Sequence, residues 1–228
     1  MSIAENLEFV KKEIYTTAKK CGRNPDDITL VAVSKTVGVD QIEEAIQTGM
    51  KDFGENRVQE LVGKREKIVE DVKWHQIGRL QTNKVKYLIG KDVLIHSLDR
   101  MELAVEIARL SEKKGLETEV LIQINVSEED TKAGIRVDEV DAFLDQLAVL
   151  KGINVVGLMT IAQNTVNFDE IRQVFSKLRE IYIDIQNERI DNNIQMKYLS
   201  MGMSHDYQIA IEEGSNMLRI GTLIFGER

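Results

Sequence analysis

A lysine and two glycine-containing loops are the residues of this chain whose types and positions could do chemistry. Lys35 follows the apolar run "LVAVS" (30–34), within the segment "AVSKT" (32–36). A lysine at the end of a buried strand is either a surface residue or an amine held ready to react with a carbonyl. The segments "SMGMS" (200–204) and "RIGT" (219–222) combine glycine with hydroxyl side chains. Such loops offer N–H and O–H donors, which suit an anion.

Several residues within these loops are candidate ligands of a phosphate group. Gly202 lets the backbone approach a ligand closely, and Ser200 and Ser204 offer hydroxyl donors. Gly221 and Thr222 add further N–H and O–H donors. We expect a helix to begin near Ser204, so that the N–H groups of its first turn also favour an anion. Either loop alone could be an ordinary glycine turn, but together they predict a phosphate site.

An arginine near these loops suggests which phosphorylated group would bind. Arg219 precedes Gly221 by two residues and is predicted to face inward, as a structural ion-pair partner or as the partner of a cofactor ring. A cofactor phosphate, a lysine, and an arginine at the ring nitrogen are together typical of pyridoxal phosphate (PLP). A Schiff base forms only from a neutral amine, which desolvation or a nearby positive charge favours. Lys35, Arg219 and the two loops therefore predict a PLP site.

The elements that must position these residues alternate between strands and helices. We predict eight strands, at 28–34, 51–53, 73–77, 92–96, 118–125, 154–159, 197–199 and 217–220. After the first strand and the helix that follows it, amphipathic helices are predicted at about 57–70, 82–89, 99–114, 138–150, 168–186 and 205–213. Such alternation indicates parallel βαβ units, and eight strands favour a closed (β/α)8 barrel of TIM type over an open doubly wound sheet.

The predicted helices carry their own start and stop signals. An extra N-terminal helix begins with a capping box of Ser2 and Glu5, and we expect it to cover the gap after the last strand, which no helix follows. Further N-caps are predicted at Asp40, Thr82, Asp138, Asn167 and Ser204, and glycine C-caps at Gly22, Gly90, Gly115, Gly152 and Gly214. Since Pro25 is the only proline and no linker is visible, we expect residues 1–228 to form a single domain.

Composition argues against several classes of function. The formal charge of −8 argues against a general nucleic-acid binder, which needs a basic surface. Cys21 is the only cysteine, so no intrachain disulfide is expected and a reducing compartment is indicated. No secretory signal is recognised, and no run approaches the ~20 apolar residues that span a bilayer. We expect a cytoplasmic monomer that binds neither nucleic acid nor membrane.

Other candidate residues also lie at predicted strand ends, where the chemistry of such barrels is found. Asn56 follows one strand, and His75 and His96 end two neighbouring strands. The histidines could suggest a metal-assisted hydrolase, but no carboxylate-rich strand end completes a metal site. Their predicted role is structural or beside a cofactor.

Long segments of the chain resemble a known family. These are "AVSKT", "FGENRVQE", "WHQIGRLQTNK", "HSLDR", "NVSEEDTKAG", "GLMTI", "LSMGMSHD" and "LRIGTLIFGER". They resemble the pyridoxal phosphate homeostasis proteins, a family related to the barrel domain of alanine racemases, and the resemblance covers essentially the whole chain. It implies that Lys35 carries PLP covalently as a Schiff base. It also implies phosphate contacts at Ser200, Gly202, Ser204, Gly221 and Thr222, Arg219 at the pyridine nitrogen, and Asn56 and His75 as lesser members of the pocket.

Two functions of a PLP protein remain open: a non-catalytic carrier, and a PLP-dependent amino-acid racemase. Racemisation needs a base on each face of the substrate α-carbon, and Lys35 can serve one face. By resemblance, a tyrosine of an additional C-terminal domain serves the other face in alanine racemases, and we expect this chain to lack that domain. Of its own tyrosines, only Tyr207 is expected near the mouth. We therefore expect a protein that binds and buffers PLP and delivers it to PLP-dependent apo-enzymes, without substantial catalysis.

Overall fold

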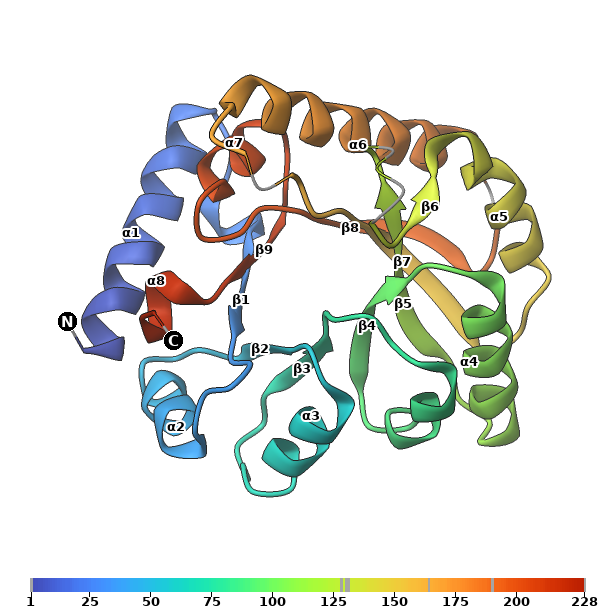
Figure 1. The fold of residues 1–228 in the computed structure, drawn as a ribbon, viewed down its shortest axis with the longest axis horizontal. Helices are drawn as coiled ribbons and strands as arrows, with labels where there is room; N and C mark the ends of the chain where they lie inside the picture. Colours follow the sequence, from blue (N-terminus) through green and yellow to red (C-terminus); the bar gives the residue numbers. More distant parts are fainter. Residues whose placement is uncertain (1, 128, 130–131, 164, 190, 228) are drawn as a thin grey trace.

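Eight of the nine strands in the described part of the chain are parallel, follow chain order and close into a barrel (Figure 1). This computed structural model describes residues 2–127, 129, 132–163, 165–189 and 191–227. The barrel strands are β1 (Thr29–Val33), β2 (Asp52–Glu55), β3 (Lys73–Gln76), β4 (Val93–Leu98), β5 (Thr118–Asn125), β7 (Ile153–Met159), β8 (Ile194–Ser200) and β9 (Met217–Ile220). The ring closes where β9 pairs with β1, while the short β6 (Ile135–Arg136) pairs with β5 outside it. The predicted (β/α)8 barrel is confirmed.

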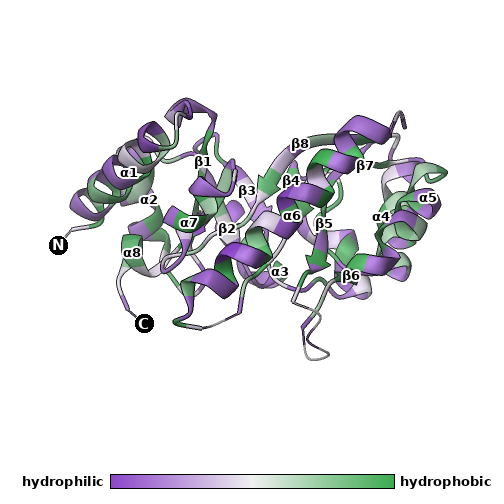
Figure 2. Ribbon diagram, turned by 90° about the horizontal axis from the view of Figure 1, so that it is seen from above, coloured by the Kyte–Doolittle hydropathy of each residue, from purple (hydrophilic) through white to green (hydrophobic). Residues whose placement is uncertain are grey.

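Helices surround the barrel and connect its strands (Figure 1). They are α1 (Ile3–Lys20), α2 (Val39–Gln47), α3 (Val58–Arg65), α4 (Met101–Lys113), α5 (Val140–Ala148), α6 (Phe168–Glu188), α7 (Tyr207–Glu212) and α8 (Thr222–Phe225), with 3₁₀ turns η1 (Pro25–Asp27), η2 (Thr82–Tyr87) and η3 (Val137–Glu139). Hydrophilic and hydrophobic residues alternate along helices such as α6, as expected for helices with one face toward the barrel (Figure 2). None of the described helices has the length and apolar content needed to span a bilayer.

The helix predicted at 82–89 is instead the 3₁₀ helix η2. Val85 is the only buried residue within η2, so the segment lacks the apolar stripe that holds an α-helix of two turns against a barrel. Leu88 and Ile89, which complete the predicted stripe, are buried just after η2 ends. The apolar residues of this segment therefore face inward as predicted, but the helix there is a 3₁₀ helix and not an α-helix.

The N-terminal helix α1 begins and packs as predicted. The Glu5 side chain accepts a hydrogen bond from the Ser2 N–H at 2.7 Å, and the Ser2 hydroxyl accepts one from the Glu5 N–H at 3.2 Å, which completes the capping box. Helix α1 contacts α2, α7 and α8. The short helix α8 contradicts the prediction that no helix follows the last strand. The Asn6 amide donates to the Ile224 carbonyl at 2.9 Å, so α1 and α8 cover this part of the barrel together.

The predicted helix boundaries are right in some places and displaced in others. Asn167 caps α6 through a hydrogen bond from the Asp169 N–H at 3.1 Å. All five predicted C-cap glycines have positive φ. The predicted caps Asp40, Thr82, Asp138 and Ser204 are wrong, because the observed caps are Gly38, Gln81, Glu139 and Asp206. Asp40 lies in the first turn of α2, where a carboxylate favours the helix dipole without capping it.

Apolar and polar residues share the barrel interior. A cluster of buried residues fills the apolar part: Val31, Leu94, Leu121, Val156, Met159 and Met217. Trp74 is buried outside this cluster against Phe53, with ring centroids 5.9 Å apart. The polar part contains His96, Ser200 and Arg219, all buried.

Strand β7 lies against β8 at a glycine, Gly157, which pairs with Tyr198. The pairing register shifts between Val155 and Gly157. A Cβ atom at Gly157 would lie only 1.9 Å from the Tyr198 carbonyl oxygen. No side chain fits in this space unless the two strands separate.

We therefore expect Gly157→Ala to lower the free energy of unfolding by at least ~2 kcal/mol. Gly63→Ala is the matched control, since Gly63 lies in α3 with nothing within 4 Å of an added Cβ. The better helix propensity of alanine should make this control neutral or stabilising, by up to ~1 kcal/mol. Urea denaturation measures both changes, and equal stability of the two variants would contradict the close approach of β7 and β8.

Candidate functional site

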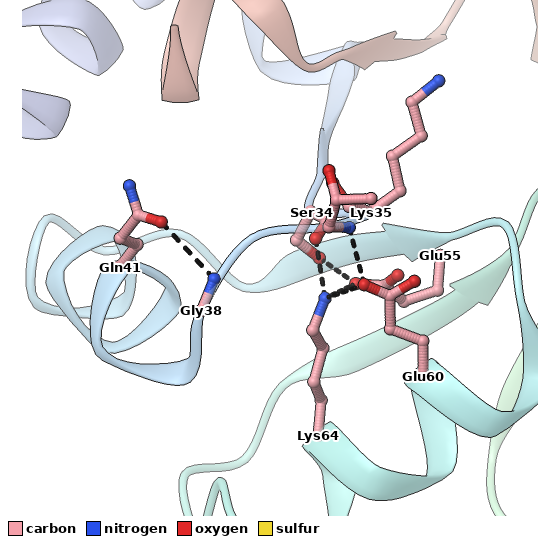
Figure 3. A network of polar contacts seen from close by, with 8 residues as sticks. Ser34, Lys35, Gly38, Gln41, Glu55, Glu60 and Lys64 are labelled. Atoms are coloured by element: carbon pink, nitrogen blue, oxygen red, sulfur yellow. Dashed lines mark hydrogen bonds and ion pairs between the residues drawn. The ribbon is translucent and has the colours of Figure 1, made fainter. Parts of the chain in front are cut away.

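Lys35 lies two residues beyond β1, at the carboxyl end of the barrel, and is exposed. Its side chain extends away from the polar residues beneath it (Figure 3). Among the described residues, none is hydrogen-bonded to its Nζ. The next residue, Thr36, has a φ of 60°, which is rare for a β-branched side chain. The backbone at Lys35 is therefore held in a costly conformation while the amine itself is free.

A buried lysine holds the peptide groups on either side of Lys35 (Figure 3). Lys64 Nζ donates to the Ser34 carbonyl and to Glu55 Oε1, both at 2.7 Å, and to Glu60 Oε1 at 3.0 Å. Glu60 Oε1 also accepts the Thr36 N–H at 2.6 Å. The residues before and after Lys35 are thus tied to α3 through one ion-paired group. Such surrounding contacts can maintain the strained backbone of Thr36.

The two carboxyl groups of this network have opposite pKa shifts. Burial raises the pKa of Glu55, although hydrogen bonds from Lys64 and Ser34 oppose the shift. Burial opposes but does not outweigh the hydrogen bonds from Lys64 and the Thr36 N–H, which lower the pKa of Glu60. Glu60 is therefore the carboxylate that keeps its charge beside Lys64 most readily.

The two predicted phosphate loops meet at Ser204. Its hydroxyl oxygen accepts the Gly221 N–H at 3.4 Å and lies 3.1 Å from the Thr222 hydroxyl. Gly202 has a φ of 97°, and a Cβ there would lie 2.6 Å from the Ala210 Cβ. The loop after β8 therefore needs glycine to pass this close to α7. Ser204, Gly221 and Thr222 form one cluster of donors, as the sequence predicts.

Arg219 lies buried inside the barrel and is anchored at two nitrogens. Its Nη1 donates to Ser200 Oγ at 2.6 Å and its Nη2 donates to the Thr160 carbonyl at 2.8 Å. Burial lowers the pKa of Arg219 to about 10, while the charge of Asp206 raises it. A guanidinium with this pKa remains protonated at neutral pH. The predicted inward orientation of Arg219 is what the structure shows.

Ser200 lies with Arg219 rather than with the loop cluster. Its side chain is buried, and besides accepting from Arg219 its Oγ lies 3.2 Å from His96 Nδ1. Ser200 is the last residue of β8, whereas Ser204 lies in the loop beyond that strand. The two serines are therefore separated along the direction of the strand. The structure thus divides the predicted phosphate residues into two groups.

Asn56 and His75 lie toward opposite ends of the barrel. Asn56 is exposed just after β2 and lines a cavity of about 270 Å³ with Asn125 and Lys132. His75 lies within β3, and its Nε2 is 3.0 Å from Asp52 Oδ1 at the start of β2. It lines a larger cavity, of about 470 Å³, among residues from the amino ends of the strands. Asn56 therefore lies at the same end as Lys35, whereas His75 faces the other end.

Sequence reasoning missed Lys64, Glu55 and Asp52. Glu60 and Lys64 are four residues apart on α3 and form an ion pair, so their spacing was a usable signal. Glu55 was a second signal, because it is a charged residue at the end of a strand that is otherwise buried. Lys132 lines the cavity at the barrel mouth, and residues 128, 130 and 131 of its loop lie outside the described residues.

Comparisons with known proteins agree with this geometry. The profile of the family described as "Alanine racemase, N-terminal domain" matches residues 6–228. The pyridoxal phosphate homeostasis protein of Aquifex aeolicus (strain VF5) is 45% identical over 229 residues, which cover 100% of this chain and 99% of the relative. The protein of the same name from Escherichia coli (strain K12) is 40% identical over 240 residues, covering 99% of this chain and 97% of the relative.

Solved structures show the same relationship. PipY of Synechococcus elongatus PCC7942, with PLP bound, has a TM-score of 0.85 and 31% identity, and the match covers 99% of this chain and 100% of PipY. Alanine racemase from E. faecalis has a TM-score of 0.74 at 16% identity, with 100% of this chain matching 59% of that chain, and so shares the fold. By its family profile and its full-length relatives, this chain belongs to the pyridoxal phosphate homeostasis protein family, within the family of the alanine racemase N-terminal domain.

Proposed function

We propose that this protein binds PLP through Lys35, buffers it and delivers it to PLP-dependent apo-enzymes. One observation carries the proposal: an amine, a buried guanidinium and a cluster of hydroxyl and N–H donors lie on three neighbouring strands and their loops. Lys35 follows β1, which pairs with β9, and β9 carries Arg219 and pairs with β8. The name of the curated relatives and the PLP bound to PipY support the same ligand.

The residues present fit the parts of PLP. Ser204, Gly221 and Thr222 would hold the phosphate, with the backbone at Gly202 leaving room for it, since these donors are of the kind that bind phosphate. The Arg219 guanidinium has five N–H donors, and those not used toward Ser200 and Thr160 can face the ring nitrogen. When bound, PLP supplies an aldehyde that reacts with an amine. Lys35 Nζ would form that bond.

Ser200 and His75 take indirect roles in this proposal. The Ser200 hydroxyl lies between Arg219 and His96, so we assign it to holding Arg219 rather than the phosphate. His75 faces the amino end of the barrel and would reach the cofactor only through other residues. Asn56, exposed at the carboxyl end, would flank the cofactor directly.

The arrangement favours binding over turnover. A racemase needs a second base opposite Lys35, and all five tyrosines lie within helices or strands. Tyr15, Tyr87, Tyr182 and Tyr198 lie on α1, η2, α6 and β8, and Tyr207 lies buried at the start of α7. Burial and, next, the charge of Glu13 on α1 raise the pKa of Tyr207, which keeps its phenol protonated. In addition, Arg219 keeps its proton, so a pyridine nitrogen held against it would stay unprotonated and be a weaker electron sink.

The covalent link can be tested by reduction. Borohydride treatment of the PLP-loaded protein, followed by peptide mass mapping, should place the label on Lys35. Lys35→Ala should remove the label, whereas Lys132→Ala, at the same end of the barrel, should retain it. A label on any other lysine, or none, would reject Lys35 as the attachment site.

The phosphate cluster predicts selectivity between two ligands that differ only in the phosphate. PLP should bind far better than pyridoxal. The double variant Ser204→Ala, Thr222→Val should weaken PLP binding by about 1.5–3 kcal/mol for each charge-assisted hydrogen bond lost, and pyridoxal binding should stay nearly unchanged. Titration followed by the visible absorbance of the bound cofactor measures both affinities. Equal affinity for PLP and pyridoxal would mean that the loops are ordinary turns.

The carrier role predicts the absence of enzyme-like turnover. Incubation of the PLP-loaded protein with L-amino acids in deuterated water should give no substantial exchange of the α-proton and no loss of chirality. Transfer should be visible in the same preparation as activation of an added PLP-dependent apo-enzyme. Turnover that depends on Lys35 would favour the racemase alternative instead.

A further inference from the structure

A column of hydrogen bonds runs through the barrel interior from Arg219 to Asp52. Arg219 Nη1 is 2.6 Å from Ser200 Oγ, which is 3.2 Å from His96 Nδ1. His96 Nε2 is 2.9 Å from His75 Nδ1, and His75 Nε2 is 3.0 Å from Asp52 Oδ1. The five residues come from five different strands. Four of them are buried, and Asp52 at the amino end is half-buried.

With both imidazoles neutral, the chemistry of the two ends fixes the direction of every bond in the column. A guanidinium can only donate, and a carboxylate can only accept. Ser200 Oγ therefore accepts from Arg219, and its own hydrogen is available for His96 Nδ1. Nε2 of His96 then carries the proton donated to His75 Nδ1. Likewise, Nε2 of His75 carries the proton donated to Asp52.

This order requires both imidazoles to be neutral, with the proton on Nε2. A second proton on His96 would place an N–H opposite the Ser200 hydroxyl and add a cation beside Arg219. Burial, followed by the neighbouring His75 and the positive charge of Arg219, holds the pKa of His96 well below its ordinary value of 6.5. The electrostatic surroundings therefore agree with the direction set by the two ends.

We propose that Asp52, His75 and His96 are positioning residues that fix the Arg219 guanidinium through Ser200, acting from the opposite end of the barrel. The Ser200 hydrogen is held by His96, so its lone pairs stay directed at Arg219 Nη1. With Nη2 fixed by the Thr160 carbonyl, two bonds on two nitrogens set the plane of the guanidinium. The functional value of that plane rests on the proposed binding of PLP.

The column also connects Arg219 to the cavity at the amino end. Asp52 and His75 line this cavity of about 470 Å³ together with Lys73, Asp92 and Glu119. A change in the charge or position of Asp52 would therefore reach Arg219 through bonds that all point the same way. Two apolar residues lie beside this route on neighbouring strands: Val31 pairs with Arg219, and Leu94 pairs with His75.

Nitrogen NMR of the ligand-free protein tests the direction of the column. His75 and His96 should both give the signals of an imidazole protonated at Nε2 and not at Nδ1, and His96 should show no titration near pH 6.5. His205, which lies in a loop outside the column, serves as the internal reference. A proton on Nδ1 of His96, or its titration near pH 6.5, would overturn the proposal.

Variants of His96 test whether the column positions Arg219. His96→Leu removes the acceptor for Ser200, and His96→Asn keeps an oxygen acceptor near the Nδ1 position. In the ligand-free protein, the two Nη groups of Arg219 should give separate NMR signals that merge in His96→Leu and remain separate in His96→Asn. Leu103→Ala, a destabilising change at a buried residue of α4, should leave them separate. Merged signals in the Leu103 variant, or unchanged signals in His96→Leu, would refute the positioning role.

Binding measurements separate this proposal from the proposed function. We expect His96→Leu to weaken PLP binding about tenfold, as for one lost hydrogen bond to a charged group, with His96→Asn close to wild type. If the wild-type protein fails to bind PLP but its Arg219 signals behave as described, the function is wrong and the positioning role stands. If PLP binds equally well to wild type and His96→Leu with unchanged Arg219 signals, the positioning role is wrong and the function stands.

Discussion

The structure depends on burying one positive charge, the guanidinium of Arg219, inside a barrel. A buried cation is costly unless acceptors and opposite charge surround it. Ser200 and the Thr160 carbonyl supply acceptors, and Asp206 supplies charge. Asp206 also accepts from the Met203 N–H and is the N-cap of α7. The residue that offsets Arg219 therefore also fixes the loop that carries Gly202 and Ser204.

The backbone of Arg219 strengthens this coupling. Its N–H donates to the Gly202 carbonyl at 3.0 Å, so the strand that carries the cation also holds the loop after β8. The loop after β9 begins two residues later and reaches Ser204 through Gly221. A group that binds at these loops thus contacts a surface whose shape is set by the buried charge. In this barrel, the contacts that fix Arg219 therefore also fix the donor cluster.

The sequence predicted the parts of the site that follow from chain position. An apolar strand ends just before Lys35, and glycine and hydroxyl residues follow two other strands. Such places at strand ends locate a residue along the barrel axis even when the tilt of the strands is unknown. His75 and Ser200 were placed less well, because their roles depend on which way a strand residue points and on how far neighbouring strands are shifted. The pairing of His75 with Gly54 and Leu94 sets that level. Register of this kind comes from the closed ring and is not visible in a single strand.

The contrast between Lys35 and Lys64 shows how one fold can favour binding over turnover. Lys64 is buried with three hydrogen-bond acceptors, whereas Lys35 is exposed and no described residue is hydrogen-bonded to its amine. Under the proposed function, a bond between Lys35 and an aldehyde forms in contact with water, which can also hydrolyse it. The buried network holds the backbone in place while the amine remains exchangeable. Rigid support beneath an exposed amine suits a protein that must both capture PLP and release it.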